Sequence, residues 1–252
     1  MKKLLSLTLS IIMIISLAAC GNNQQAATPN NPSSKKLIMC TNAEFPPYEY
    51  KEGGNFVGID VEVSKLLGQK LGVEVEILDI AFDSLIPTVT SGKADFAMAG
   101  MTVTEDRQEY VDFSHTYQTA VQSIVVPSNS AIEDIDDLNG KKIGVQQGTT
   151  GDIYCTNDYG NDFIERFPKI VDGFQAMKSG RIDACVVDDE VAKNIVAQDS
   201  SSYKILDTKY AEEEYAIAVK KGNTELLDKI NKVIDEIKSS GELKRIVDKY
   251  IK

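Results

Sequence analysis

Hydrophobic and polar residues alternate strictly from Val73 to Leu78, which predicts a β-strand with one polar face. Upstream, apolar positions recur at helical spacing up to a glycine stop, at Val63, Leu66, Leu67, Leu71 and Gly72. Apolar runs at 36–41 and 94–99 predict two further strands, and residues 83–90 a short helix. The resulting β-α-β-α-β order indicates an α/β fold with a mostly parallel, twisted sheet covered by helices.

The pattern restarts after an apolar extended run at 121–127. Strands are predicted at 142–146, 182–187 and 215–219, and helices from about 152, then at 174–179, 190–198, 225–239 and 242–251. The last two helices are left over from this second α/β unit. If they return to the first unit, two antiparallel strands cross between the units near Ser123–Pro127 and Ala216–Lys220, and such a pair forms a hinge.

The N-terminus has the pattern of an export signal. Lys2 and Lys3 precede the apolar run Leu4–Ala19, which is shorter than the ~20 residues of a spanning helix. The sequence Leu-Ala-Ala-Cys at 17–20 resembles the bacterial lipobox, which implies a signal peptide at 1–19 and a lipidated Cys20. Residues 20–34 are uncharged and rich in Asn, Gln and Pro, as expected of a flexible tether. The alternative is a plain signal peptide with an incidental cysteine.

Charge and cysteine content exclude several functions. The chain of 252 residues has a formal charge of −11, and of −13 once Lys2 and Lys3 leave with the signal, which argues against nucleic acid. Cys40, Cys155 and Cys185 are far apart, and neither they nor the single His115 have metal-ligand spacing. We therefore expect no disulfide framework, no metal and no cofactor.

Several motifs, in order and across residues 35–252, resemble the extracytoplasmic solute-binding proteins of ABC importers for polar amino acids. They are Thr41–Tyr48 (TNAEFPPY), Val57–Val61 (VGIDV), Phe82–Pro87 (FDSLIP), Ala99–Arg107 (AGMTVTEDR), Leu138–Val145 (LNGKKIGV), Gly148–Gly151 (GTTG) and Ile182–Asp188 (IDACVVD). The resemblance implies a two-lobed periplasmic-binding-protein fold of type II with the ligand between the lobes. Lobe 1 is expected at 35–123 plus 218–252, and lobe 2 at 124–217.

A free amino acid carries a carboxylate and an ammonium, and burying either charge requires a partner. Arg107 can bind the carboxylate through two parallel N–H bonds, helped by the Thr102 hydroxyl and by a backbone that can approach at Gly100. Thr149 and Thr150 stand in a loop that leads into a helix, where free N–H groups favour an anion.

The ammonium is expected to meet Asp188, whose family counterpart binds the α-amino group and which follows a buried strand. Phe45 and Phe82 are expected to sandwich the aliphatic part of the ligand. Taken singly, each of these residues has an ordinary structural interpretation: Arg107 as a surface ion pair, the two phenylalanines as core residues, and Asp188 as a helix cap.

Side-chain selectivity is expected to depend on Asn42, Glu44, Gln146 and Val187. Glu44, if it faces inward, would attract a cationic end. Many basic-amino-acid binders carry an acid where Asn42 stands, whereas many glutamine binders carry a histidine at position 187 and a lysine at position 146. The balance favours a basic amino acid such as arginine, lysine or ornithine.

We thus expect a lipid-anchored, monomeric receptor on the outer face of the cell membrane. It would capture an L-amino acid and deliver it to a membrane permease that a separate ATPase drives. Two other functions occur for the same fold or for similar lipoproteins. One is a cyclic-acid dehydratase, such as a cyclohexadienyl dehydratase, which needs a general acid or base in the cleft. The other is a ligand sensor for a separate receptor.

Overall fold

The structure is a computed structural model that describes residues 36–251. The predicted signal peptide, the tether and Cys20 lie outside the described residues.

The strands are β1 (Lys36–Thr41), β2 (Glu44–Phe45), β3 (Glu49–Glu52), β4 (Asn55–Val57), β5 (Glu74–Asp79), β6 (Phe96–Ala97), β7 (Val111–Phe113), β8 (Gln118–Pro127), β9 (Ile143–Gln146), β10 (Ile164–Phe167), β11 (Ala184–Asp188), β12 (Tyr203–Tyr215) and β13 (Ala218–Lys220). The α-helices are α1 (Ile59–Leu71), α2 (Leu85–Thr90), α3 (Glu105–Gln108), α4 (Thr150–Tyr159), α5 (Ile170–Lys178), α6 (Asp189–Gln198), α7 (Thr224–Ser239) and α8 (Glu242–Tyr250). Short 3₁₀ turns occupy Phe82–Ser84, Asp136–Leu138 and Asn161–Phe163.

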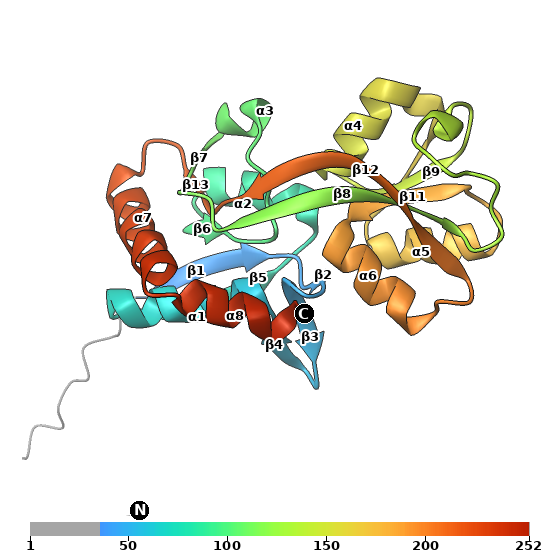
Figure 1. Ribbon diagram of the computed structural model, residues 1–252. Helices are drawn as coiled ribbons and strands as arrows, with labels where there is room; N and C mark the ends of the chain where they lie inside the picture. The colour runs from blue at the N-terminus through green and yellow to red at the C-terminus, as the bar shows by residue number, and fades with distance from the viewer. Residues whose placement is uncertain (1–35, 252) are drawn as a thin grey trace, which may run out of the picture. The chain divides into compact units, whose positions relative to one another are not determined.

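The first lobe is built on a five-stranded sheet in the order β5-β1-β6-β13-β7 (Figure 1). Strand β1 runs parallel to β5 and β6, as predicted for a β-α-β-α-β unit, and β13 joins antiparallel from the far end of the chain. Helices α7 and α8 follow β13 and pack with α1, so the C-terminal helices return to the first lobe. The expectation of a two-lobed α/β fold is confirmed.

The second lobe has a sheet in the order β10-β9-β11-β8-β12. Strand β9 runs parallel to β10 and β11, whereas β8 and β12 are antiparallel to their neighbours. Helices α4, α5 and α6 follow β9, β10 and β11 respectively, so the N-terminus of α4 comes directly after the carboxyl end of β9. This is the edge of a parallel sheet where ligands are usually bound.

Two long antiparallel strands, β8 and β12, join the lobes. They pair from Tyr203 opposite Pro127 to Tyr215 opposite Gln118, and Tyr215 also bridges to Thr102 of the first lobe. The predicted hinge pair is therefore present as antiparallel strands, but its second member is β12 and not the segment 216–220, which belongs to the first sheet. Residues 203–214 were not predicted as a strand, because their sequence (YKILDTKYAEEE) lacks a regular alternation of apolar and polar residues. In the structure, the pairing of this strand with β8 has two register shifts.

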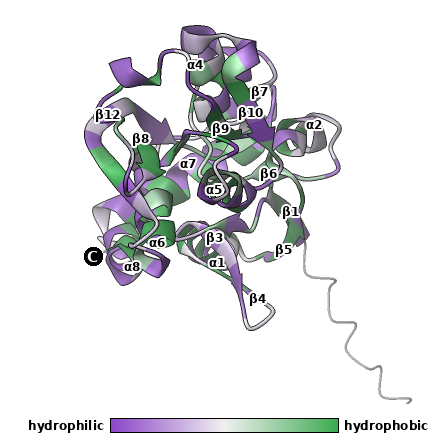
Figure 2. Ribbon diagram, turned by 90° about the vertical axis from the view of Figure 1, so that its right-hand side faces the viewer, coloured by the Kyte–Doolittle hydropathy of each residue, from purple (hydrophilic) through white to green (hydrophobic). Residues whose placement is uncertain are grey.

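A small antiparallel sheet, β2-β3-β4, was also not predicted. Its strands have two to four residues, and β3 is mostly polar, so neither length nor periodicity marks it in the sequence. In Figure 2 this hairpin is purple to white, whereas central strands such as β1 and β9 are green. The sheet nevertheless matters, because it places Phe45 and Glu49 beside the pocket described below.

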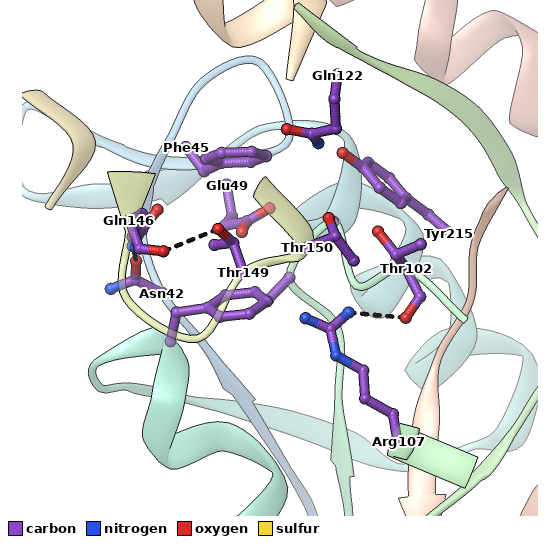
Figure 3. Close-up of a pocket in the computed structure, with 13 residues that line it drawn as sticks. Asn42, Phe45, Glu49, Thr102, Arg107, Gln122, Gln146, Thr149, Thr150 and Tyr215 are labelled. Atoms are coloured by element: carbon purple, nitrogen blue, oxygen red, sulfur yellow. Dashed lines mark hydrogen bonds between the residues drawn. The ribbon is translucent and has the colours of Figure 1, made fainter. Parts of the chain in front are cut away.

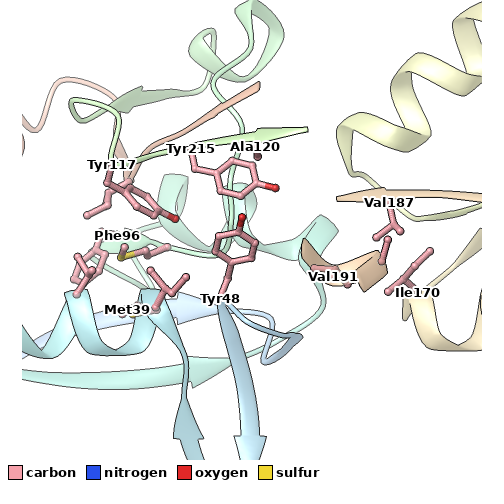
Figure 4. Packing of buried hydrophobic residues seen from close by; sticks show 14 of the residues in the cluster. Met39, Tyr48, Phe96, Tyr117, Ala120, Ile170, Val187, Val191 and Tyr215 are labelled. Carbon is pink, nitrogen blue, oxygen red and sulfur yellow. The ribbon is translucent and has the colours of Figure 1, made fainter. Parts of the chain in front are cut away.

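Apolar residues of both lobes form the core. In the first lobe, Met39, Phe96 and Tyr117 are buried near Tyr48 and Tyr215 (Figure 4). Helix α7 contributes an apolar stripe of Leu226, Ile230, Val233, Ile234 and Ile237, while its other faces are charged. In the second lobe, Cys155 is buried with Ile143, Val145 and Val186. Cys40, Cys155 and Cys185 are all buried, free thiols, so no disulfide joins the described cysteines.

Gly58 marks a close approach of two backbone segments at the start of α1. It adopts φ +120°, and a Cβ atom at this position would lie 2.2 Å from the carbonyl oxygen of Tyr48. Gly58→Ala should therefore lower the free energy of unfolding by about 2–4 kcal/mol, measured by urea denaturation. Gly54→Ala is the matched control, since Gly54 also has a positive φ but open space around it, and should cost only about 1 kcal/mol. Equal losses in the two variants would contradict this assignment.

Candidate functional site

A pocket lies between the lobes (Figure 3). Its lining combines residues from the first lobe, from the linking strands and from the start of α4: Asn42, Phe45, Glu49, Phe82, Ala99, Gly100, Thr102, Arg107, Gln122, Gln146, Thr149, Thr150 and Tyr215. The structure thus brings together nine residues that the sequence singles out: Asn42, Phe45, Phe82, Gly100, Thr102, Arg107, Gln146, Thr149 and Thr150.

Arg107 enters the pocket from α3, whose N-cap Thr104 accepts a hydrogen bond from the Arg107 amide. Its side chain donates from Nη1 to the carbonyl oxygen of Thr102 (2.7 Å) and from Nη2 to that of Gly148 (3.1 Å). The guanidinium also lies 5.4 Å from the centre of the Phe82 ring. A guanidinium has five N–H donors, so N–H groups remain for a ligand.

Burial is the main electrostatic effect on this guanidinium. Only 6% of Arg107 is exposed, and this desolvation lowers its pKa, while the nearby carboxylate of Glu213 acts in the opposite sense. Within the described part of the chain, no carboxylate forms an ion pair with Arg107. A buried cation held by neutral carbonyls is a site for an anionic group.

The first turn of α4 faces the same region. Thr149 is its N-cap, and its hydroxyl accepts from the amide of Asp152 while donating to the carbonyl of Gln146. Ile153 bonds back to the Thr149 carbonyl, so the amides of Thr150 and Gly151 are left as orphan donors of the first turn. These amides and the positive end of the helix favour an anion beside Arg107.

Aromatic rings form the apolar walls. Phe45 and Phe82 line the pocket, and Phe45 stacks on Tyr48 with ring centres 5.9 Å apart. Gly100 has φ +51°, and a Cβ there would lie 3.2 Å from both Phe45 and Tyr215. The absence of a side chain at Gly100 thus keeps the pocket open between these rings.

Side chains from the two lobes are already hydrogen-bonded across the pocket entrance. Gln146 Nε2 donates to Asn42 Oδ1 (2.8 Å), and Gln147 Nε2 donates to Asp83 Oδ2 (2.8 Å). Together with the bond from Arg107 to Gly148, these contacts describe a form in which the lobes are in contact. Asn42 and Gln146 therefore satisfy part of each other's polarity instead of both pointing at a ligand.

Glu49, Ala99, Gln122 and Tyr215 line the pocket without having been predicted. Glu49 is fully buried on β3; neither of its carboxylate oxygens accepts from a donor group of the described residues, and the carboxyl of Asp60 lies close enough to share a proton with it. Burial, and then the neighbouring carboxylate of Asp60, raise the pKa of Glu49 well above its ordinary value. Its position in the short motif Pro46–Tyr50 gave no periodic signal, so only the fold identifies it.

Asp188, Glu44 and Val187 do not line the pocket. Asp188 is 1% exposed; its Oδ1 caps α6, and its Oδ2 accepts from the Tyr215 hydroxyl (2.6 Å). The predicted inward position of Glu44 is not what the structure shows, because its carboxylate forms an ion pair with Lys169 near the surface. Val187 packs with Ile170 and Val191 in the apolar core of the second lobe (Figure 4).

Two further observations concern the described residues alone. No cluster of three His, Cys, Asp or Glu side chains that could hold a metal ion occurs in residues 36–251. Over the same range, none of the helices combines the length and apolar character required to cross a membrane.

Residues 37–252 match the model of the bacterial extracellular solute-binding proteins, family 3. The arginine-binding extracellular protein ArtP of Bacillus subtilis (strain 168) is 39% identical over 99% of this chain and 98% of its own. An ancestral arginine-binding protein, solved bound to arginine, is 41% identical with a TM-score of 0.82, covering 87% of this chain and 100% of the other.

The substrate-binding protein of an amino acid ABC transporter is also similar, at 39% identity and a TM-score of 0.79, over 86% of this chain and 99% of the other. The family and the first two relatives are named for binding extracellular solutes or arginine, and the third is the substrate-binding protein of an ABC transporter. The prediction of a binding protein in place of a dehydratase is thereby confirmed.

The buried carboxyl of Asp188 should make the stability of the fold depend on pH. Burial raises its pKa to about 7 from an ordinary value of 3.8, so the folded state holds this proton more tightly than the unfolded chain. Ionisation therefore weakens the folded state as the pH rises from about 4 to about 7. Asp188→Asn retains a helix cap but no longer ionises.

We expect the stability of the wild type, relative to Asp188→Asn, to fall across this window by up to about 1.4 kcal/mol per pH unit. Urea unfolding of both proteins at a series of pH values measures this difference. Parallel stability curves for the two proteins would show that the Asp188 carboxyl keeps an ordinary affinity for its proton.

Proposed function

Because the chain belongs to the bacterial extracellular solute-binding proteins of family 3, we propose that it is the ligand-capturing component of an ABC importer for an L-amino acid with a cationic side chain, such as arginine. The observation that carries this proposal is the polarity of the pocket. A buried guanidinium and a helix N-terminus lie at one part of its wall, and buried carboxylates lie in or behind the other parts. A zwitterion with an additional positive charge complements this arrangement.

The ligand carboxylate is assigned to Arg107 and the first turn of α4. The free N–H groups of Arg107 supply charge-assisted bonds, and the amides of Thr150 and Gly151 supply two more donors from the other lobe. Since one anion then holds donors of both lobes, the ligand itself stabilises the closed form. A ligand shifts the lobes only through such contacts, which the open form lacks.

The cationic end of the side chain is assigned to Glu49. Glu49 lines the pocket, and its buried carboxyl meets no donor group of the described residues, only the neighbouring carboxyl of Asp60, with which it can share a proton. The titratable groups that face it are acids or phenols from several elements, namely Asp60 on α1, Asp79 on β5, Asp188 on β11, Tyr48 and Tyr117. No basic side chain of the described residues neutralises Glu49, so a cationic ligand group would be its first positive partner.

The ligand ammonium is assigned to the part of the wall near Thr102, Gln122 and Tyr215. The predicted help of the Thr102 hydroxyl to the ligand carboxylate is thereby withdrawn, because that hydroxyl donates its proton to Glu213. Two acids stand directly behind this wall: Glu213, which accepts from Thr102 and Gln122, and Asp188, which accepts from Tyr215. Asp188 was predicted to meet the ammonium directly; because it does not line the pocket, we propose that it acts instead through the Tyr215 hydroxyl. Phe45 and Phe82 would enclose the aliphatic part of the ligand and exclude water.

Closure and delivery complete the proposal. The lobes, proposed at 35–123 plus 218–252 and at 124–217, would move about β8 and β12, and the closed form would dock on a membrane permease driven by a separate ATPase. Cys20 would carry lipid and hold this monomeric receptor at the outer face of the cell membrane.

Isothermal titration calorimetry of residues 35–252 with each of the twenty amino acids tests the function. We expect L-arginine to bind with a dissociation constant near 1 μM, or about −8 kcal/mol. Arg107→Ala should weaken the binding of every amino acid by at least about 100-fold, because a buried carboxylate would lose its ionic partner. Arg181→Ala, an exposed arginine outside the pocket, is the control and should bind as the wild type does. No heat from any amino acid would refute the proposed function.

A second prediction concerns Glu49 and pH. An arriving guanidinium favours the ionised carboxylate, so binding should release the proton that the raised pKa of Glu49 retains in the empty pocket. Affinity for L-arginine should therefore rise with pH as Glu49 gives up its proton, above the ordinary range of a glutamate carboxyl, and be lost as the pH falls. Titrations in buffers of different ionisation enthalpy count the released protons.

Glu49→Gln should weaken the binding of L-arginine by about 10- to 100-fold at neutral pH and abolish the proton release that accompanies binding. Glu44→Gln is the matched control, since Glu44 pairs with Lys169 outside the pocket, and should change neither quantity. If Glu44→Gln reduced the affinity and Glu49→Gln did not, the cationic end of the ligand would belong near Lys169 instead.

A further inference from the structure

Glu213 lies on β12, the strand that joins the lobes, and it is the inward member of an acidic run. Because successive side chains of a strand point to opposite faces, Glu212 and Glu214 are exposed while only 6% of Glu213 is exposed. A buried carboxylate has to be compensated by hydrogen bonds or by charge. The hydrogen bonds to Oε2 of Glu213 come from the wall of the pocket, and the Tyr154 hydroxyl lies near the same carboxylate outside that wall.

One oxygen of Glu213 holds two residues of that wall. Oε2 accepts from the Thr102 hydroxyl (2.9 Å) and from Nε2 of Gln122 (3.0 Å). Thr102 lies in the segment between β6 and α3 of the first lobe, and Gln122 lies on β8. Both line the pocket, whereas Glu213 itself stays behind them. Figure 3 shows Thr102 and Gln122 on the same side of the pocket, flanking Tyr215.

The direction of these bonds determines what the pocket can recognise. A carboxylate only accepts, so Thr102 uses its single hydroxyl proton on Glu213, and the remaining lone pairs of Oγ1 can only accept from a ligand. Gln122 is oriented in the same way, with its NH₂ group on Glu213 and its oxygen turned toward Gly151 at the start of α4. Without Glu213, either side chain could rotate to present a donor.

We propose that Glu213 is a positioning residue that makes this part of the wall an acceptor of hydrogen bonds, and thereby selects ligands that carry an α-ammonium group. The inference rests on the proposed function and adds a residue that does not touch the ligand. A ligand with a donor at this position gains a bond to Thr102 Oγ1, and a ligand without one leaves a buried acceptor unpaired. The cost of such an unpaired group gives the selectivity.

A second role for Glu213 has a different signature. Its carboxylate acts on the charge of Arg107, so it could serve only as a buried counter-charge. Removing a counter-charge changes the binding of every ligand carboxylate in the same way. Removing a positioning residue changes the ratio between ligands that have and lack the ammonium. The ratio therefore separates the two roles.

The experiment compares two ligand pairs by calorimetry: L-arginine with 5-guanidinopentanoate, and L-glutamine with glutaramate. The second member of each pair lacks only the α-ammonium. In Glu213→Gln, the new amide can donate to Thr102. Of L-arginine and L-glutamine, the one that binds the wild type more tightly should lose about 10- to 100-fold in affinity, whereas its des-amino analogue should lose less than about threefold. Glu214→Gln, the exposed neighbour, should leave all affinities unchanged.

Thr102→Val supplies a second, independent test, because it removes the hydroxyl and keeps the shape. It should show the same selective loss, and the double variant should lose no more than the larger single loss, since both act through one bond. If Glu213→Gln fails to fold, Glu213→Asp takes its place, because the shorter carboxylate is drawn away from the Thr102 hydroxyl and should give the same selective loss. Equal losses for both members of a pair, or losses that multiply in the double variant, would overturn the inference while amino-acid binding stands. A wild type that binds no amino acid would overturn the proposed function and this inference together.

Discussion

The guanidinium of Arg107 lies between the lobes, and its hydrogen bonds go to the backbone carbonyls of Thr102 on one side and Gly148 on the other. Desolvating a cation is unfavourable unless an anion or several strong acceptors compensate it. Neutral carbonyls compensate only in part, so contact between the lobes around this group is incomplete without an anion. In the proposed function, the carboxylate of an amino acid supplies that anion, and the α4 amides that would also meet it belong to the other lobe. Ligand binding and closure would then be one event.

The acids around the pocket follow from the same constraint. Glu49 stands in the wall, whereas Glu213 and Asp188 stand one layer behind it and act through Thr102, Gln122 and Tyr215. Acids placed behind hydroxyl and amide groups impose a direction on their hydrogen bonds without occupying space in the pocket. The pocket then has a wall of acceptors on one side and of donors on the other, and in the proposed function this polarity would distinguish a zwitterion from a simple carboxylic acid.

Secondary structure followed the sequence pattern wherever elements were long and periodic. Helices α6, α7 and α8 begin and end within two residues of their predicted limits, and α1 ends at the predicted glycine stop, because apolar faces and stop signals are local features. Strand β12 and the β2–β4 sheet were missed. Strand β12 is half polar and bent by register shifts, since its middle crosses between lobes and is not packed on one core. Pairing with β8, which lies about 80 residues away in the chain, decides its conformation.

For the site, motif and chemistry were sufficient to find Arg107, Thr102, the α4 loop and the two phenylalanines, because an anion requires a guanidinium and a helix start, and both leave a local signature. The orientation of the acids was not available in this way. Glu44 and Glu49 are five residues apart on neighbouring short strands, and only the β2–β3 hairpin turns one toward Lys169 and the other into the pocket. Likewise, Glu212, Glu213 and Glu214 are chemically identical in the sequence. The sequence alone thus determined the chemistry and the elements that carry it, and the tertiary structure decided which carboxylate faces the ligand, because that depends on strand pairing between distant segments and on the burial that results.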